Sequence, residues 1–284
     1  MEVLLKIGGL MFSLNGKGIV VTGGNAGIGE GCVRAFVEAG AKVVFCARRE
    51  DLGKKLEQEL CCTGHDITFV QADLTVAEDN KRVIDTCIKQ YGRVDGVVCN
   101  AGGSVQKWTH QYSVEEWKKT IDLNFNSAFI LCKYALPYMM KQRKGSIVFM
   151  GSATMAKPQP FESPYSVPKA AMAQLACHIS LEYCRYGIRA NTIAPGATFT
   201  PILAKAGLTP EQAGAMNAAN KCAFPKDIAN IARFLISDET ECITGTTIYA
   251  DYGYACGDRY DQLVGLGYYE KAIKQEDDAY LNIL

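Results

Sequence analysis

Three residues of this chain have the types and spacing to move a proton at neutral pH. Tyr165 and Lys169 are four residues apart, so on a helix they share one face, a turn from each other. A free tyrosine has a pKa of about 10, and an ammonium ~4 Å away at an effective dielectric of about 20 would lower it by roughly three units. Ser152, thirteen residues before Tyr165, could hold a substrate oxygen and stabilise charge on it. Because Tyr–Lys pairs at this spacing are common by chance, the pair indicates a catalytic site only in combination with other motifs.

A second motif follows a short apolar run, 18–22, and leads into a helical pattern. It reads Thr-Gly-Gly-Asn-Ala-Gly-Ile-Gly over residues 22–29. Glycines let a backbone approach a pyrophosphate closely, and a helix N-terminus adds free N–H groups. A tight turn without a ligand is the alternative, but the strand–loop–helix context favours a dinucleotide. The expected contacts are Gly23, Asn25, Gly27, Ile28 and Gly29.

The end of the second predicted strand distinguishes between two forms of that cofactor. In NAD-binding units an acidic residue here holds the adenosine ribose hydroxyls. This chain has Arg48 and Arg49 instead, and a guanidinium pairs with a ribose 2′-phosphate. The sequence therefore predicts NADP(H) in preference to NAD(H). The alternative is that both arginines are solvated charges at the start of a helix.

Short β-branched runs and amphipathic helical stretches alternate along nearly the whole chain. Near-continuously apolar strands in such an alternation predict a parallel sheet covered on both faces, an α/β fold of about seven strands. The predicted strands are 18–22, 42–46, 67–71, 94–99, 146–150, 189–193 and 247–249. The predicted helices are 28–39, 51–60, 77–91, 114–141, 165–186 and 227–237. Pro164 fits the first turn of its helix, and Gly40 and Gly187 fit left-handed helix ends.

No linker divides the chain, so a single domain over 14–256 is expected, with an arm at 1–13 and a tail at 257–284. The segment 197–225 is rich in Pro, Gly and small residues, and is predicted to be a substrate lid. The first ten residues have an early acid and no basic start, which argues against a signal peptide. No apolar run is long enough to span a bilayer, so the protein is expected in the cytoplasm without membrane attachment.

Composition excludes other classes of function. A formal net charge of zero argues against nucleic acid as the main partner. The twelve cysteines include no CxxC pair, so no metal site is predicted. Those in apolar stretches are expected to be buried, reduced thiols: Cys32, Cys46, Cys87, Cys99 and Cys132. None of the three histidines is near a nucleophile motif, and no GxxxxGK[ST] loop is present.

Taken together and in this order, the motifs resemble the short-chain dehydrogenase/reductase family over residues 14–253. The resemblance implies a Rossmann fold with a doubly wound parallel sheet. It further implies that Asp73 with Leu74 meets the adenosine, that Asn100-Ala101-Gly102 borders the cofactor, and that Pro195-Gly196 with Thr198 and Thr200 holds the carboxamide. Departures from the family pattern are Gly151 before the serine, Pro168 before the lysine, and Ala250-Asp251-Tyr252-Gly253 near the end.

The resemblance also implies an activity, hydride transfer between nicotinamide and a secondary alcohol or ketone. Tyr165 would be the acid/base, Lys169 would bind ribose and lower the tyrosine pKa, Ser152 would position the substrate oxygen, and Asn124 would support a proton relay. A homo-oligomer, a dimer or tetramer, is implied too. An apolar small molecule such as a hydroxysteroid or bile acid is the favoured substrate. The alternatives are a 3-oxoacyl-carrier reductase and a non-catalytic NADP(H)-binding sensor or structural protein.

Overall fold

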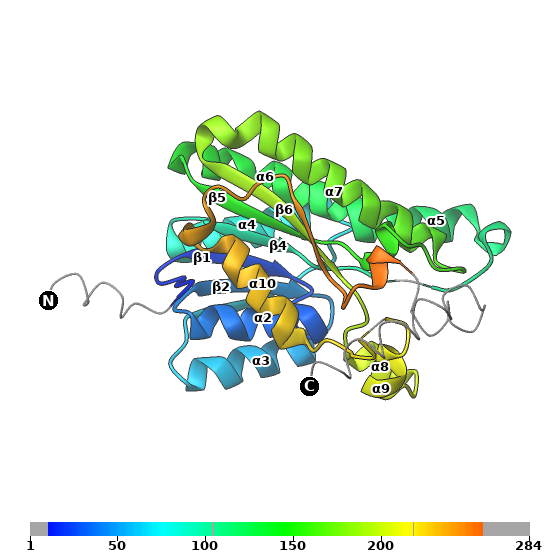
Figure 1. Cartoon of the computed structure of the whole chain (residues 1–284). Coiled ribbons are helices and arrows are strands. Elements are labelled where there is room, and N and C mark those ends of the chain that lie inside the picture. The colour runs from blue at the N-terminus through cyan, green and yellow to red at the C-terminus, as the bar shows by residue number, and fades with distance from the viewer. Residues whose placement is uncertain (1–10, 104, 218, 258–284) are drawn as a thin grey trace, which may run out of the picture.

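The computed structural model describes residues 11–257 except 104 and 218. Within this part, seven parallel strands form one sheet in the order β3-β2-β1-β4-β5-β6-β7 (Figure 1). The strands are β1 (Gly18–Thr22), β2 (Lys42–Ala47), β3 (Ile67–Gln71), β4 (Gly96–Cys99), β5 (Gly145–Met150), β6 (Ile188–Pro195) and β7 (Thr247–Ala250). The sheet grows from β1 in both directions, so the order reverses between β1 and β4. Such a reversal opens a crevice at the carboxyl ends of the strands.

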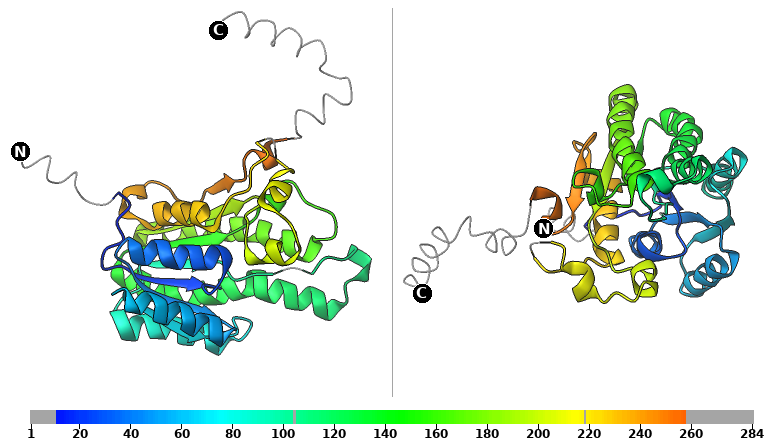
Figure 2. Two further views of the ribbon diagram at one scale, coloured as in Figure 1. Left: turned by 90° about the horizontal axis from the view of Figure 1, so that it is seen from below. Right: turned by 90° about the vertical axis from the view of Figure 1, so that its right-hand side faces the viewer.

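Helices cover both faces of the sheet, as Figures 1 and 2 show. The helices are α2 (Gly27–Glu38), α3 (Glu50–Cys62), α4 (Ala77–Tyr91), α5 (Val114–Ile121), α6 (Ser127–Gln142), α7 (Ser163–Tyr183), α8 (Pro201–Lys205), α9 (Pro210–Gly214) and α10 (Pro225–Ile236). On one face α2, α3 and α10 pack on side chains such as Ile19 and Val21, and on the other α4, α6 and α7 pack on Val20 and Val97. This is the predicted doubly wound α/β fold.

Most predicted elements occupy their expected positions, and several ends have a visible cause. Gly40 and Gly187 have φ of +87° and +69° and end their helices in the left-handed region. The helix that carries Tyr165 begins at Ser163 with proline in its first turn. The fourth strand begins at Gly96 rather than residue 94, after Asp95, whose buried carboxylate accepts the Gly18 N–H at 2.9 Å.

The predicted helix 114–141 is interrupted. A π-helical turn, Asp122–Asn126, separates α5 from α6. In it the Asn124 side chain donates to the Thr120 carbonyl at 2.9 Å, and the Ser127 hydroxyl donates to the Leu123 carbonyl at 2.6 Å. Side chains that bond to carbonyls of the preceding turn disturb the regular helix ladder. Apolar periodicity alone does not reveal such an interruption.

The first described residues pack on α10. The Phe12 ring meets Phe234 edge-on with ring centroids 5.1 Å apart, and the Arg233 guanidinium donates to the Phe12 carbonyl at 2.8 Å. The rest of the predicted arm, 1–10, and the predicted tail beyond 257 lie outside the described residues. The five cysteines predicted to be buried thiols are free and buried.

Candidate functional site

The loop between β1 and α2 is folded so tightly that only glycine fits. Gly23 has φ +63° and Gly27 has φ +57°. A Cβ at Gly29 would stand 2.1 Å from the Gly23 carbonyl oxygen. No side chain caps the N-terminus of α2 at Ala26, so the N–H groups of its first turn face outward from the loop without a side-chain acceptor. The loop thus forms a narrow cradle with positive character at the crevice.

Asn100 fastens this loop to the end of β4. Its amide group donates to the carbonyls of Thr22 at 2.8 Å and Gly23 at 3.3 Å. In return, the Thr22 hydroxyl accepts the backbone N–H groups of Asn100 at 2.9 Å and Ala101 at 3.0 Å. The same hydroxyl donates to the Val98 carbonyl at 3.2 Å. The two strands on either side of the crevice are therefore locked together at their carboxyl ends.

Arg48 and Arg49 lie exposed just beyond β2, beside Asp73 beyond β3. Within the described residues, neither guanidinium has a hydrogen bond or a close ion pair. Hydrogen bonds from the Thr75 hydroxyl and N–H hold the pKa of Asp73 below its usual range, and the charge of Arg48 adds to the effect. Asn25 ties the glycine loop to this corner by donating to the Arg49 carbonyl at 3.1 Å.

Ser152, Tyr165 and Lys169 come together just after β5 and at the start of α7. Ser152 is buried, and its Oγ accepts the Thr154 hydroxyl at 3.0 Å. Burial raises the pKa of Tyr165 above its ordinary value, and a hydrogen bond with Ser152 offsets part of that rise. Lys169 is buried one turn further along the helix, with Nζ 5.5 Å from the centroid of the Tyr165 ring. Pro168 lies between them without breaking α7.

The expected lowering of the tyrosine pKa by Lys169 does not occur in the protein alone. The Lys169 ammonium donates to the Met150 carbonyl at 2.8 Å, and it lies over the ring rather than beside the hydroxyl. Burial also lowers the pKa of Lys169 itself, to about 8. Desolvation, which the spacing of two residues does not reveal, therefore dominates both groups.

Asn124, in the π-helical turn, borders Gly102 together with Lys169. It is fully buried, its Oδ1 accepts the Gly103 N–H at 3.2 Å, and its Nδ2 donates to the Gly103 carbonyl at 2.8 Å. A Cβ at Gly102 would lie 2.5 Å from Asn124 Oδ1 and 3.2 Å from Lys169 Nζ. Glycine at 102 thus leaves open the approach to both polar groups. Single π-helical turns between α-helical segments are frequent at functional sites.

The segment after β6 completes the crevice. At Gly196 a Cβ would stand 2.8 Å from the Asp251 Cα, so this turn packs tightly against the end of β7. The Thr198 hydroxyl donates to the Gly196 carbonyl at 3.1 Å. Thr200 approaches the glycine loop, since a Cβ at Gly27 would lie 3.3 Å from Thr200 Cγ2. The structure therefore brings the residues after Pro195 to the same edge as the glycine loop and Ser152.

The two ends of the segment predicted to be a lid lie side by side. Residues 198 and 223 form a parallel bridge, and the Phe199 N–H donates to the Ala223 carbonyl at 2.7 Å. Between them, α8 and α9 lie toward the same end of the molecule as α5 (Figures 1 and 2). The segment exposes large apolar side chains, namely Ile202, Leu208, Met216 and Phe224.

The loop 105–112, which sequence reasoning missed, packs on the segment that follows Ser152. Trp108 of this loop packs on Phe161, which follows Ser152 in a segment with few charges. Gln159, from that same segment, donates to the Met216 sulfur at 3.9 Å and to the Tyr254 hydroxyl at 3.2 Å. These contacts join three segments, 105–112, 155–162 and the lid, and the region where they meet is called the mouth below. The sequence signal for the loop 105–112 is a tryptophan and a tyrosine among polar residues.

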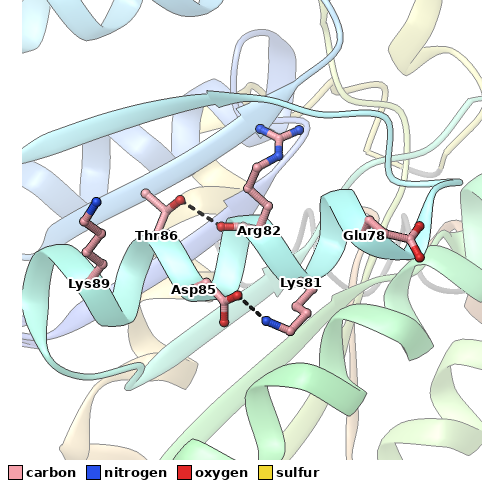
Figure 3. A pocket seen from close by; sticks show the side chains of 6 residues that line it. All are labelled: Glu78, Lys81, Arg82, Asp85, Thr86 and Lys89. Atoms are coloured by element: carbon pink, nitrogen blue, oxygen red, sulfur yellow. Dashed lines mark hydrogen bonds and ion pairs between the residues drawn. The ribbon is translucent and has the colours of Figure 1, made fainter.

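A separate hollow on α4 does not belong to the crevice. Figure 3 shows that its lining side chains all come from that one helix: Glu78, Lys81, Arg82, Asp85, Thr86 and Lys89. Over the described residues, no group of three or more His, Cys, Asp or Glu side chains is arranged to hold a metal ion. Within 11–257, apart from the two gaps, no helix is long and apolar enough to cross a membrane.

Comparison with known proteins agrees with this geometry. A family profile described as enoyl-(acyl carrier protein) reductase matches residues 23–255. L-fucose dehydrogenase of Bos taurus is 34% identical over 250 residues, covering 85% of this chain and 90% of that protein. The 3beta-hydroxysteroid dehydrogenase 1 of Eggerthella lenta is 34% identical over 245 residues, covering 84% and 94%.

Among solved structures, the crystal structure of gox2181 superposes with a TM-score of 0.82 at 29% identity, covering 87% of this chain and 98% of that one. The fold, the matched residues and these dehydrogenases lead to one conclusion. The chain belongs to the short-chain dehydrogenase/reductase family, a family of nicotinamide-dependent oxidoreductases.

Proposed function

We propose that this oxidoreductase interconverts a secondary alcohol and a ketone with NADP(H), and that its substrate is apolar, such as a hydroxysteroid or bile acid. The observation that carries the reaction is the convergence of Ser152, Tyr165 and Lys169 beside the cradle formed by the glycine loop. Two hydroxyl groups, of Ser152 and Tyr165, can bind the oxygen of a substrate. With the buried ammonium of Lys169 nearby, they suit proton transfer to or from an alcohol.

The residues present fit a nicotinamide dinucleotide. The cradle has no space for a side chain at Gly29 or at Gly102, so backbone groups can approach a ligand closely there. We assign the pyrophosphate to the N-terminus of α2, the adenosine to Asp73 with Leu74, and the carboxamide to the segment from Pro195 to Thr200. When bound, the nicotinamide supplies or accepts the hydride.

The chain's own groups would handle the proton and the oxygen. In reduction, the Tyr165 hydroxyl gives its proton to the carbonyl oxygen while Ser152 donates a hydrogen bond to the same oxygen. Lys169 would hold a ribose hydroxyl of the cofactor and stabilise the tyrosinate that remains. Asn124, hydrogen-bonded to Gly103, fixes the floor of the proton path. Because burial raises the pKa of Tyr165, its hydroxyl stays protonated at neutral pH and can act as the acid in reduction.

A substrate panel tests the reaction, with NADPH absorbance as the readout. The wild-type protein is expected to turn over keto- and hydroxysteroids faster than acetoacetyl thioesters, which the carrier-reductase alternative requires. Tyr165→Phe removes only the hydroxyl and should lower kcat by about 10²- to 10⁴-fold with unchanged NADPH binding. Tyr91 lies on α4, and its hydroxyl is 3.5 Å from the hydroxyl of Thr68. Tyr91→Phe is the matched control and should keep full activity. Tight NADPH binding without turnover on any alcohol or carbonyl would instead support a non-catalytic binding protein.

The preference for NADP(H) is supported by two unpaired guanidinium groups beyond β2 in the described chain. Charged hydrogen bonds of this kind contribute roughly 1.5–3 kcal/mol each. Arg48→Asp should therefore lower the NADPH-to-NADH ratio of kcat/KM by about 10- to 100-fold. Arg185→Asp, just ahead of β6 and so at the opposite end of the parallel strands, should leave the ratio unchanged. An Arg48 variant that keeps its preference would contradict the assignment.

Two further features of the protein belong to the proposal. A homodimer or tetramer would cover the apolar side chains exposed on α6 and α7, among them Phe129 and Leu181. A reducing, cytoplasmic compartment suits a chain whose twelve cysteines are all free thiols.

A further inference from the structure

Two large aromatic side chains stand exposed at the mouth and pack on each other. Trp108 is 58% exposed and Phe161 is 42% exposed. Their ring centroids are 4.7 Å apart, with the planes at 87° to each other. An exposed edge-to-face pair of this size presents a continuous apolar surface to solvent, which is unusual unless a ligand covers it.

The pair is held in place by a network of hydrogen bonds centred on Tyr112. The Tyr112 hydroxyl donates to the Phe161 carbonyl at 2.7 Å, shares its proton with the Val105 carbonyl, and accepts the Lys107 N–H at 3.0 Å. The Lys107 N–H also donates to the Phe161 carbonyl at 3.1 Å. These bonds join the loop 105–112 to the segment that follows Ser152, on both sides of the aromatic contact.

Two more contacts fasten the loop to the start of α7. The Gln106 amide donates to Glu162 Oε1 at 2.7 Å, and the hydroxyls of Thr109 and Ser163 are 3.2 Å apart. Tyr165 lies on the same first turn. The aromatic surface is thus fixed relative to the reacting hydroxyl by the helix that carries it.

Phe161 has a strained backbone. Its φ of +69° lies in the left-handed region, which a bulky residue rarely adopts. Such a conformation persists only where the surroundings enforce it, and it occurs most often at ligand clamps and active sites. Here the enforcing groups are the Tyr112 hydroxyl and the Lys107 N–H, both bound to the Phe161 carbonyl.

We propose that Trp108 and Phe161 form a specificity-determining ledge that holds the C–H face of a saturated ring in the substrate, the ring that bears the reacting alcohol. Tyr112 is the positioning residue of this ledge. The inference rests on the proposed alcohol–ketone reaction and adds the shape of its substrate. Steroids and pyranoses both present such a face, so the experiment must include each.

The ledge is tested by comparing cyclic with acyclic substrates in matched variants. Cyclohexanol, a hydroxysteroid and a pyranose are compared with 2-octanol, and kcat and KM are measured separately. Trp108→Ala should lower kcat/KM for the preferred cyclic substrate about tenfold or more, through KM, because an aromatic contact is worth on the order of one factor of ten. The value for 2-octanol should change less than about twofold. Trp108→Phe should restore most of the loss.

Tyr112→Phe tests the positioning role, since it removes only the hydroxyl. It should reduce the preference for the cyclic substrate over 2-octanol while leaving NADPH binding unchanged. Tyr186→Ala removes an aromatic side chain that is stacked on Arg143 and Arg185, distant from the mouth. It should leave the preference for the cyclic substrate over 2-octanol unchanged. If Trp108→Ala unfolds the loop, as a lowered Tm would show, Trp108→Leu replaces it with the same expectation.

These measurements distinguish failure of the proposed reaction from failure of the proposed ledge. A wild-type protein with no turnover on any alcohol or carbonyl overturns the proposed reaction. An active wild type whose Trp108 variants lose cyclic and acyclic substrates equally overturns the ledge alone. A Trp108→Ala protein with unchanged selectivity but a smaller solution mass also overturns it, because the pair would then be a contact between two copies of this chain.

Discussion

At the scale of single residues, burial shapes the site more than charge pairing does. Lys169 is 3% exposed, and its one hydrogen-bond acceptor in the described chain is the Met150 carbonyl. A buried ammonium with a neutral partner is stabilised far less than one in water. The protein therefore holds this cation at an energetic cost, as expected for a group kept for function rather than stability.

The cost of burying Lys169 predicts a pH-dependent stability. Its pKa is about 8 in the fold, against an ordinary value of 10.5 for a free lysine. The unfolded chain therefore binds more protons between these values, and stability rises with pH across that window. Below pH 8 the penalty is complete, about 3 kcal/mol. Lys169→Met should therefore raise the free energy of unfolding at pH 7, less the lost hydrogen bond, in the cofactor-free protein.

Denaturant unfolding at several pH values checks this expectation. The advantage of Lys169→Met should shrink as pH rises from 8 toward 10, because the wild-type lysine becomes neutral in the fold. A constant difference across that range would contradict the assignment, and Lys133→Met on the exposed side of α6 serves as the control.

The sequence predicts the residues that meet at the site but not their protonation behaviour. Ser152, Tyr165 and Lys169 are found together because their spacing on a strand end and a helix is local information. The pKa of Tyr165 depends on burial by segments far along the chain, which spacing does not contain. Trp108 was missed for a related reason, since its partner Phe161 is distant in sequence.

At the scale of elements, the joint between β1 and β4 organises the crevice. A single hydroxyl, that of Thr22, serves two N–H groups and one carbonyl at this joint. Valine has nearly the same shape but no hydroxyl, so it would leave the Ala101 N–H without an acceptor, whereas the Asn100 N–H would keep its bond to the Val98 carbonyl at 3.1 Å. Each unpaired buried group costs roughly 1–3 kcal/mol.

Thr22→Val is therefore expected to lower the Tm and to weaken NADPH binding together. The free energy of unfolding should fall by about 1–3 kcal/mol, because one N–H group loses its only acceptor. Thr22→Ser keeps the hydroxyl and is the matched control, with a much smaller loss. Calorimetry and cofactor titration provide the two readouts. A valine variant as stable as the serine variant would show that the joint does not depend on this hydroxyl.

The element boundaries show where sequence patterns are sufficient. Strand cores and the helix start at Ser163 were predictable because apolar runs and proline act locally. The break at Asp122–Asn126 was not, because the Asn124 side chain is drawn to Gly103, which precedes it by 21 residues. A long apolar pattern continues through the turn without any change in period.

At the scale of the whole molecule, three large apolar side chains are exposed on α6 and α7. Leu181 is 78% exposed, Val167 is 53% exposed and Phe129 is 51% exposed. Single apolar residues on a surface are ordinary, but three on two neighbouring helices are more than a solvated face requires. Burial of these side chains by a second copy would be stabilised by about 25 cal/mol for each Å².

Leu181→Glu should therefore reduce the oligomer mass measured by light scattering. A charge placed in an apolar contact must be desolvated without a partner, which opposes association. Lys89→Glu, at the exposed end of α4, carries the same acidic residue to a polar surface and should leave the mass unchanged. A wild-type monomer, or an unaltered mass in Leu181→Glu, would place the interface elsewhere or exclude it.

The anchoring of Phe12 on α10 has a practical consequence for handling the protein. Arg233, which holds this residue, lies in the last turn of α10, at the end of the sheet opposite the mouth. Gly257, in contrast, accepts a hydrogen bond from Lys157 at 2.8 Å, beside the mouth. A fusion partner joined immediately ahead of Met11 would start on the rear of the protein, whereas one joined after Gly257 would start beside the proposed substrate site. Attachment to a solid support should therefore use the upstream side.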